Sequence, residues 1–393
     1  MKSFYTLQFW LLCLSSFLFF SSFNMLIPEL PNYLTSLGGE DYKGLIISLF
    51  TVTAGLSRPF SGKLTDTVGR IPIMIYGVIV CIVCGFLYPI LTTVVGFLFL
   101  RFVHGMSTGF KPTATSAYVA DLVPFNKRGE AMGIMGLFGS IGMAAGPAIG
   151  SAIALHYSLN TVFYASSFMA FLSVLVLAGM KETLKEKQKF SFGLLKISPK
   201  EVLEPNVFVP SILMMCSVFS FGVVLTISPD FSEALGLANK GLFYTTFTLA
   251  SVLIRVLAGK VSDKYGRYVV MKVSLALLCI SMIYLGWATT VFHFIGASIL
   301  YGISVGMNSP TLFAWTVDLS DERFRGRGIA TMFISLEIGI GAGALLSGFV
   351  YGNNSDNIAY TFWMAGAVAF VGLLFLLWKG KAKDVIPSKM MGA

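Results

Sequence analysis

The sequence is short of charge. Charged residues make up 12% of its 393 residues, whereas apolar residues make up 55%. Soluble domains carry about 25% charged residues, so this chain cannot cover a surface that faces water on all sides. The composition therefore predicts a membrane protein with many apolar spans and excludes an ordinary soluble domain.

Acidic residues are scarcer than basic ones, with 19 Asp and Glu against 28 Lys and Arg and a net charge of +9. A basic balance can indicate nucleic-acid binding, but here the basic residues lie in short loops between apolar runs. Such loops are typical of the cytoplasmic side of membrane proteins. We therefore expect a lipid bilayer, and no nucleic acid, as the partner.

The residues that carry most metal and enzyme chemistry are few. The three histidines, His104, His156 and His293, are too dispersed for a metal site, and the five cysteines all lie inside apolar runs. A buried Cys packs there as a small apolar group. Phosphate-binding loops and nucleophile triads are absent from the sequence. We expect no metal, no cofactor and no enzymatic activity.

A spanning helix needs about 20 mostly apolar residues. The apolar run after Lys2 resembles a signal peptide but continues past Phe23 without a small-residue cleavage site, so we interpret it as the first membrane helix. The sequence predicts an all-α membrane protein with twelve transmembrane helices. The twelve segments are 6–35, 44–62, 71–91, 94–119, 129–155, 159–180, 206–230, 239–259, 268–289, 292–317, 326–351 and 357–379.

The distribution of basic residues predicts the orientation. With the N-terminus inside, 22 of the 28 Lys and Arg fall on the cytoplasmic side, four within spans, and two, Lys43 and Lys240, on the outer side. Cytoplasmic loops carry such an excess of positive charge. We therefore expect a multi-pass protein of the cell membrane with both termini in the cytoplasm.

The chain contains an internal repeat. GKLTDTVGR at 62–70 returns as GKVSDKYGR at 259–267, 197 residues later, and this offset is half of the chain. The chain is thus predicted to be two copies of a six-helix unit, which run parallel. The predicted domains are an N-terminal half at 1–182, a cytoplasmic linker at 183–204 and a C-terminal half at 205–393.

The repeated turns resemble the first signature of the major facilitator superfamily, G-x-L-x-D-x-x-G-R, and the resemblance covers the whole chain. It implies secondary transport by alternating access, with a cavity between the halves that helices 1, 4, 7 and 10 line. It also implies that these turns act as a conformational latch. The latch residues would be Arg58, Gly62, Asp66, Gly69 and Arg70, and in the second copy Arg255, Gly259, Asp263, Gly266 and Arg267.

The start of the fourth span is similar to a second family signature, l-x-x-x-R-x-x-q-G, with His104 in place of Gln. The resemblance links Arg101 to proton coupling, and the titratable His104 is a further candidate for that role. On a helix, Arg101, His104, Thr108 and Lys111 fall within about 80° of one another. We expect this polar stripe to face a water-filled path; the alternative is that its side chains only bond neighbouring helices.

The fifth span looks like the antiporter signature G-x8-G-x3-G-P-x-x-G-G, with Ser151 replacing the final Gly. The resemblance implies the drug–proton antiporter branch. Glycines three or four apart also form a flat face that lets membrane helices approach closely, so a packing role alone remains open. The matching residues are Gly133, Gly142, Gly146, Pro147 and Gly150.

Ionisable side chains within a span cost several kcal/mol unless paired or hydrated, so each is a functional candidate. Glu29, which lies between Pro28 and Pro31, is the best candidate for carrying a proton, and a pairing with Arg101 would let substrate and proton compete for it. Candidates for lining the substrate cavity are Asn24, Thr108, Lys111 and Glu337.

These observations support three hypotheses. The first is proton-coupled efflux of small amphipathic compounds, of the multidrug-resistance type, by a monomer. The second is a proton-linked or facilitative carrier of an anionic metabolite, motivated by the cations Arg101 and Lys111. The third is a membrane receptor that does not transport.

Overall fold

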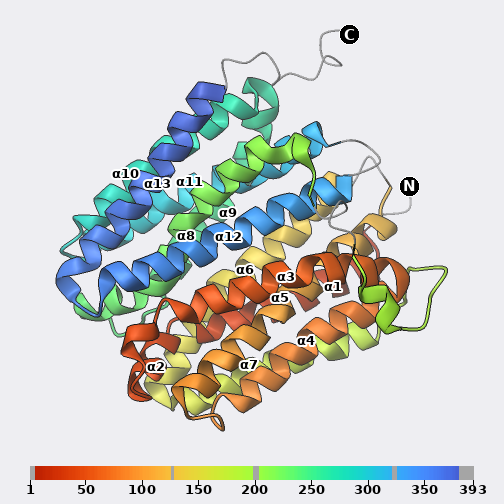
Figure 1. Ribbon diagram of the computed structural model, residues 1–393, viewed down its shortest axis with the longest axis horizontal. Coiled ribbons are helices and arrows are strands. Elements are labelled where there is room, and N and C mark those ends of the chain that lie inside the picture. The colour runs from red at the N-terminus through yellow and green to blue at the C-terminus, as the bar shows by residue number, and fades with distance from the viewer. Residues whose placement is uncertain (1–4, 125–127, 198–202, 321–324, 380–393) are drawn as a thin grey trace. The chain divides into compact units, whose positions relative to one another are not determined.

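The computed structural model describes residues 5–124, 128–197, 203–320 and 325–379. Within these residues the protein consists of thirteen α-helices joined by turns and short 3-10 helices, without a β-strand (Figure 1). The short α2 (Leu30–Ser36) follows α1 (Leu7–Leu26) across a break at Pro28 and Glu29. Counted together they make one segment, so the described chain has the twelve long helical segments that the sequence predicts.

The helices of the two halves follow one another in the same order. After α1 and α2 come α3 (Leu45–Thr67), α4 (Arg70–Leu87), α5 (Val94–Leu122), α6 (Arg128–His156) and α7 (Leu159–Ala178). The later ones are α8 (Phe208–Ala234), α9 (Leu242–Tyr265), α10 (Arg267–Gly286), α11 (Val291–Leu319), α12 (Arg325–Tyr351) and α13 (Ile358–Lys379).

The chain forms two compact units. Unit 1 comprises Met1–Ile197 and Leu237–Thr245, and unit 2 comprises Ser198–Gly236 and Thr246–Ala393. The predicted boundaries at 182 and 205 stay a prediction, because unit 1 also takes in most of the linker and a short segment that includes the start of α9.

Three helices do not have the composition of simple membrane spans. Nine segments of the described chain are long and apolar enough to cross a bilayer, and α3, α5 and α9 are not among them. α3 contains Arg58 and Asp66, α5 contains Arg101 and Lys111, and the apolar part of α9 is short. Charges inside a span must be satisfied by protein or water. The helices that are least typical of spans therefore carry many of the candidate functional residues.

The turn predicted at 62–70 is shorter in the structure. α3 continues to Thr67 and α4 begins at Arg70, so Gly62 and Asp66 lie in the last turns of a helix. Gly69 completes the turn with φ +142°, and its counterpart Gly266 has φ +87°. Side chains are strained in that region of backbone space, which explains a Gly in both copies.

Glycines of α6 bring its backbone against α1. A Cβ atom on Gly142 would lie 2.6 Å from the Phe17 carbonyl oxygen, and one on Gly146 would lie 2.6 Å from the Ser21 carbonyl oxygen. Real Cβ atoms do not come this close, so these positions admit only glycine without movement of a helix. Gly133 differs, because a Cβ there meets nothing within 4 Å.

Unit 2 repeats this contact. Gly339 and Gly343 of α12 stand 197 residues after Gly142 and Gly146, and a Cβ on either would overlap the carbonyl oxygens of Met215 and Phe219 on α8. Small residues let membrane helices pack backbone against backbone. The glycine face is thus a packing surface in both units, while the exchange role that the antiporter signature implies stays a prediction.

These contacts predict different effects for the same substitution at two sites of α6. Gly146→Ala should cost about 1–3 kcal/mol, because the added methyl group forces α6 and α1 apart. Gly133→Ala should be neutral or stabilise by up to about 1 kcal/mol, because alanine is the better helix former. Thermal unfolding of both purified variants in detergent measures the difference. Equal midpoints would show that the α1–α6 contact is not close-packed.

Candidate functional site

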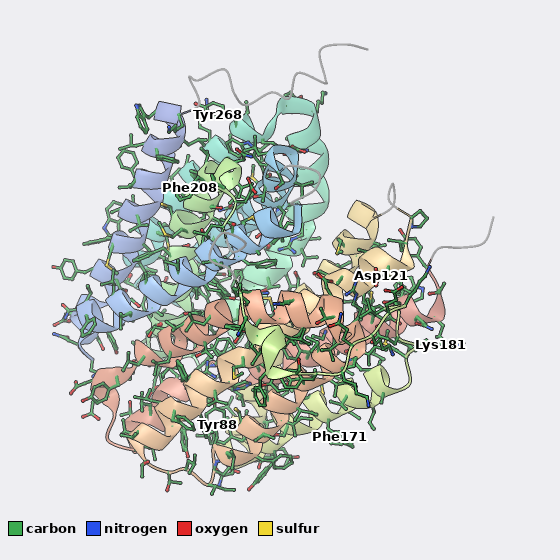
Figure 2. The ribbon with its side chains drawn as sticks, turned by 45° about the vertical axis from the view of Figure 1, so that its right-hand side comes forward. Tyr88, Asp121, Phe171, Lys181, Phe208 and Tyr268 are labelled. Atoms are coloured by element: carbon green, nitrogen blue, oxygen red, sulfur yellow. The ribbon has the colours of Figure 1, made fainter. Side chains whose placement is uncertain are left out.

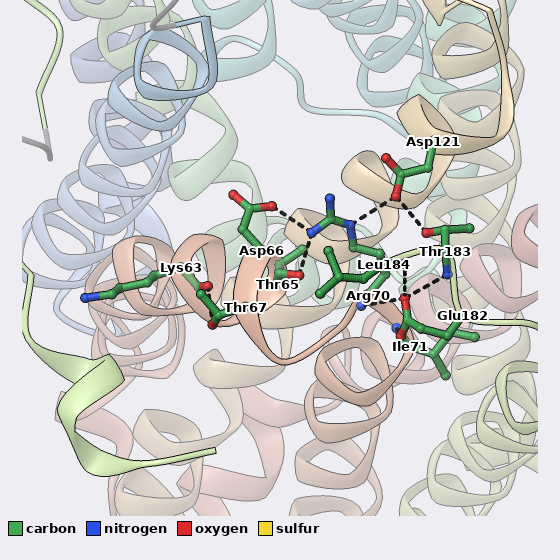
Figure 3. Close-up of polar contacts among 10 residues, drawn as sticks. All are labelled: Lys63, Thr65, Asp66, Thr67, Arg70, Ile71, Asp121, Glu182, Thr183 and Leu184. Carbon is green, nitrogen blue, oxygen red and sulfur yellow. Dashed lines mark hydrogen bonds and ion pairs between the residues drawn. The ribbon is translucent and has the colours of Figure 1, made fainter. Parts of the chain in front are cut away.

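Arg70 is the centre of a polar cluster where α3, α4 and α5 meet (Figure 3). Its Nε donates to Asp121 Oδ2 over 3.1 Å, and one terminal nitrogen donates to Asp66 Oδ1 over 2.7 Å and to the Thr65 carbonyl oxygen over 2.6 Å. A guanidinium presents five donors in a rigid fork, which suits it to join several acceptors. The predicted latch residues Asp66, Gly69 and Arg70 therefore lie together.

The residues that follow α7 take part in this cluster. Glu182 Oε1 accepts from the backbone N–H of Arg70 over 3.1 Å, and Oε2 accepts from that of Ile71 over 3.0 Å. The first N–H groups of a helix lack partners and carry a partial positive charge, so a carboxylate stabilises them. Thr183 Oγ1 donates to Asp121 Oδ2 over 2.6 Å. The residues just after α7 thus fasten the N-terminus of α4.

Unit 2 contains part of the same arrangement. Arg267 Nε donates to Asp318 Oδ2 over 3.1 Å and a terminal nitrogen donates to Ser262 Oγ over 2.8 Å. The residue 197 positions after Glu182 is Lys379, so the carboxylate is not repeated. The surroundings of Gly259 and the side chain of Asp263 lie outside the described part of the structure.

Gly62, Arg58 and Arg255 complete the predicted latch. Gly62 lies in the last turns of α3, and a Cβ there meets nothing within 4 Å. Arg58 is buried in α3 and donates to Thr113 Oγ1 of α5 over 3.3 Å, so it braces these two helices. Arg255 holds the corresponding position in α9.

Arg101 belongs to a buried network at the opposite end of unit 1. Its Nε donates to the Ile46 carbonyl oxygen over 2.9 Å, and a terminal nitrogen donates to Tyr88 Oη over 3.2 Å. The guanidinium carbon lies 4.7 Å from the centroid of the Phe50 ring. Figure 2 shows Tyr88 far from Asp121 and Lys181, which mark the end with the Arg70 cluster.

His104 extends the network across three helices. Its Nδ1 lies 3.1 Å from Tyr88 Oη, and its Nε2 lies 3.2 Å from Cys81 Sγ. Cys81 Sγ in turn lies 3.1 Å from Ser22 Oγ of α1. Buried polar groups are costly unless they find such partners. The network fixes the His104 ring between α4 and α5.

Lys111 lies about two turns after His104 along α5. Its Nζ donates to Ser16 Oγ of α1 over 2.8 Å and lies 5.2 Å from the centroid of the Phe19 ring. Thr108, on the same face, donates to the carbonyl oxygen of Gly105 within its own helix over 3.1 Å.

The expectation that this stripe of α5 faces a water-filled path is wrong for this structure. Arg101, His104, Thr108 and Lys111 are all 7% exposed or less. Three of the four side chains bond neighbouring helices, because α1, α3 and α4 pack closely around α5 and offer hydroxyl, carbonyl and thiol groups to them. The stripe is a set of contacts within unit 1.

Glu29 occupies the N-cap position of α2, at the break in the first membrane segment, but its side chain makes no capping hydrogen bond. Its Oε1 accepts from Ser151 Oγ of α6 over 2.7 Å. The pairing of Glu29 with Arg101 is not formed in this structure, because Arg101 donates its hydrogen bonds to the Ile46 carbonyl oxygen and to Tyr88 Oη. The predicted cavity residue Asn24 is buried at the end of α1, where its Nδ2 donates to the Phe20 carbonyl oxygen over 2.7 Å.

Two further predicted residues lie apart from this cluster. Glu337 is buried in α12 of unit 2. Pro147 lies inside α6 next to Gly146, and Gly150 follows one turn later, where a Cβ would overlap the Met25 carbonyl oxygen. Among the described residues no group of three or more His, Cys, Asp or Glu side chains is arranged to hold a metal ion.

Comparison with known proteins agrees with this arrangement. The sequence profile of the Major Facilitator Superfamily matches residues 12–238 and 210–390. Multidrug resistance protein 2 of Bacillus subtilis is 27% identical over 391 residues, which cover 94% of this chain and 94% of the relative. The multi-drug resistance efflux pump PmrA of Streptococcus pneumoniae is 31% identical over 266 residues, which cover 64% of this chain and 66% of the relative. The chain belongs to the major facilitator superfamily.

The crystal structure of a D-xylose–proton symporter has the same fold, with a TM-score of 0.77 over 96% of this chain and 97% of its own, at 16% identity. The protein is therefore a secondary transporter of this superfamily, a multi-pass membrane protein that carries small molecules, and not an enzyme. The resemblance found in the sequence, the fold and the class of function are confirmed.

Several residues of this transporter's clusters were missed in the sequence. Tyr88 and Ser16 gave no signal, because a Tyr at a helix end or a Ser in an apolar run is common. Glu182 follows α7 as one charge among many. Ser151 did give a signal: it stands where the antiporter signature has Gly, and this departure places the hydroxyl that binds Glu29.

The Glu182 cap can be tested against its counterpart in unit 2. Glu182→Ala should lower the free energy of unfolding by about 1–3 kcal/mol, because it leaves two N–H groups of α4 without their carboxylate. Lys379→Ala is the matched control and should change stability little. Thermal unfolding of both variants measures this. If the two midpoints fall equally, Glu182 does not cap α4.

Proposed function

We propose that this transporter exports small amphipathic compounds in exchange for protons, as a monomer with both termini in the cytoplasm. Glu29 carries the proposal. Among the described residues its carboxylate has one hydrogen-bond partner, the Ser151 hydroxyl. A carboxylate that is bound to a neutral hydroxyl can gain a proton without the rupture of an ion pair, whose loss in a buried site costs about 3–5 kcal/mol.

The position of Glu29 suits a proton taken from outside. It lies at the end of α1 opposite to Gln8, which hydrogen-bonds Tyr118 near the Arg70 cluster. The excess of Lys and Arg on the side of that cluster supports a cytoplasmic location for it. Glu29 then lies toward the outer, acidic side, where protonation would accompany release of substrate.

The Arg70 cluster would act as the latch in this cycle. Arg70 and its acceptors Asp66 and Asp121 join the ends of α3, α4 and α5, so those ends move as one body while the cluster holds. Asp66 is exposed and is the acceptor best placed to exchange partners. Transport requires such a group to release and re-form as the units rock.

Proton coupling is tested by Glu29→Gln in proteoliposomes with an acidic lumen. The lipophilic cation tetraphenylphosphonium should accumulate in wild-type vesicles, because protons that leave drive its entry. Glu29→Gln should lose this accumulation at least about tenfold, since the amide cannot exchange a proton. It should retain exchange of labelled for unlabelled tetraphenylphosphonium without a pH gradient.

Glu40→Gln provides the matched control, because Glu40 is an exposed carboxylate in the short 3-10 helix after α2. It should transport as the wild type does. Gradient-driven accumulation that survives in Glu29→Gln would rule out Glu29 as the proton carrier, and accumulation that is absent in wild type would contradict export of lipophilic cations.

A second candidate function is the transport of an anionic metabolite. Its support is that Arg101 and Lys111 are buried cations with no carboxylate partner among the described residues. An anion that reached these groups after a change of conformation would replace partners that are only neutral.

Lys111→Ala distinguishes the two candidates. Under anion transport it should weaken binding of an amphipathic carboxylate by about 1–3 kcal/mol, through loss of a charge-assisted hydrogen bond. Under cation export the affinity for tetraphenylphosphonium should stay unchanged or rise. Equilibrium binding to purified protein measures both, with Lys63→Ala as a control on the exposed end of α3. An unchanged carboxylate affinity removes the second candidate.

A further inference from the structure

The first half of the linker is fastened to unit 1 at several points. The backbone N–H of Gln188 donates to the Thr67 carbonyl oxygen over 2.8 Å, and Lys63 Nζ donates to the Lys196 carbonyl oxygen over 2.5 Å. Leu194 and Leu195 pack against the apolar core of the unit. The linker is therefore held against the end of α3 on both sides of the segment 189–193.

Between these points the linker presents two aromatic side chains to the surroundings. Phe190 is 52% exposed and Phe192 is 83% exposed, and their rings lie edge to face with centroids 5.7 Å apart. A fastened segment could have turned such side chains toward the core, as it does with Leu194 and Leu195. Exposed aromatic pairs in a fixed loop are typical of surfaces that meet another apolar phase.

Lysines precede the aromatic pair. Lys185, Lys187 and Lys189 are exposed, and among the described residues none of the three ammonium groups has a partner. The segment 185–192 contains three Lys and one Glu, a net positive charge. Cationic and aromatic side chains together are the composition of segments that lie in the interface of a membrane.

The linker also starts where the apolar surface of α7 ends. Phe171 and Leu175 of α7 are exposed apolar side chains of the kind that face lipid, and Lys181 follows three residues after the end of the helix at Ala178 (Figure 2). The segment after Lys181 is thus at the level where lipid tails give way to headgroups, rather than out in bulk water.

We propose that residues 185–192 dock onto anionic lipid headgroups, with Phe190 and Phe192 inserted at headgroup level and Lys185, Lys187 and Lys189 against the phosphates. The leaflet concerned is the one that we propose to be cytoplasmic, where anionic lipids attract basic segments. Glu182 and Thr183, a few residues before this surface, bond the Arg70 cluster. Lipid contact therefore reaches the latch through a short, fastened stretch of chain.

The test replaces Phe192 by the photocrosslinker p-benzoylphenylalanine in the full-length protein, in nanodiscs that mix phosphatidylglycerol with phosphatidylcholine. Because Phe192 is exposed, the larger ring does not disturb the fold. After irradiation, mass spectrometry should find lipid adducts enriched in phosphatidylglycerol over its share of the disc. A matched crosslinker at Phe292, exposed at the start of α11, should give adducts in the bulk ratio.

Charge removal completes the test. The double variant Lys187→Gln with Lys189→Gln should lower the enrichment up to about 30-fold. The reason is that each lysine near an anionic membrane surface contributes about 1 kcal/mol of attraction. Lys264→Gln with Lys272→Gln removes two lysines from unit 2 and should leave it unchanged. Absence of lipid adducts at position 192, adducts in the bulk ratio, or equal effects of the two double variants would each overturn the proposal. None of these readouts depends on transport, so failure of proton-coupled export would not affect them.

Discussion

The close contact of helix backbones at glycines is the constraint on which the rest of each unit depends. Inside a bilayer, lipid tails are as apolar as leucine, so helices associate through packing rather than through the hydrophobic effect. Glycines provide that packing between α1 and α6, and again between α3 and α5, where a Cβ on Gly105 would overlap the Phe50 carbonyl oxygen. The equivalent Gly302 of α11 meets the Phe247 carbonyl oxygen of α9 in the same way.

This packing decides what the polar side chains of α5 can do. Gly105 and Gly109 bring α5 against α3, and the side chains of Arg101 and His104 are buried within the unit. The Arg101 guanidinium finds a carbonyl oxygen of α3 and the Tyr88 hydroxyl of α4. The network is thus the way in which closely packed helices satisfy buried polar groups, and its geometry is set by the glycines.

The sequence was sufficient to predict the helices, the two repeats and the position of the repeated charged turn, because each has a local signature. Apolar runs of spanning length mark helices, and the offset of 197 residues is visible in the letters alone. The sequence was not sufficient to predict which residues of other helices each polar side chain contacts. The helical wheel correctly placed Arg101, His104 and Lys111 on one face, but a wheel does not contain the neighbouring helices, so water and protein could not be distinguished.

The same limit applies to the two carboxylates. Glu29 was recognised as an acid within a predicted span, yet its partner Ser151 lies 122 residues away and is selected by the register of α6 against α1. Glu182 caps α4 from 111 or more residues away, and nothing in the pattern around it distinguishes a cap from a solvated charge. Register between helices depends on side-chain shapes along the whole contact, which no short motif encodes.

The two units share their packing but not their chemistry. The Phe50 and His104 rings lie edge to face with centroids 5.6 Å apart, and 197 residues later Phe247 and Tyr301 do the same at 5.4 Å. The shape is kept, while the ionisable His is replaced. Arg101 likewise corresponds to Ser298, and Lys111 to Asn308. Small residues at helix contacts are needed in both units for the fold, whereas a buried charge is a cost in either unit. The buried cations of α5 therefore have no counterpart in α11, although the two helices pack against their neighbours in the same way.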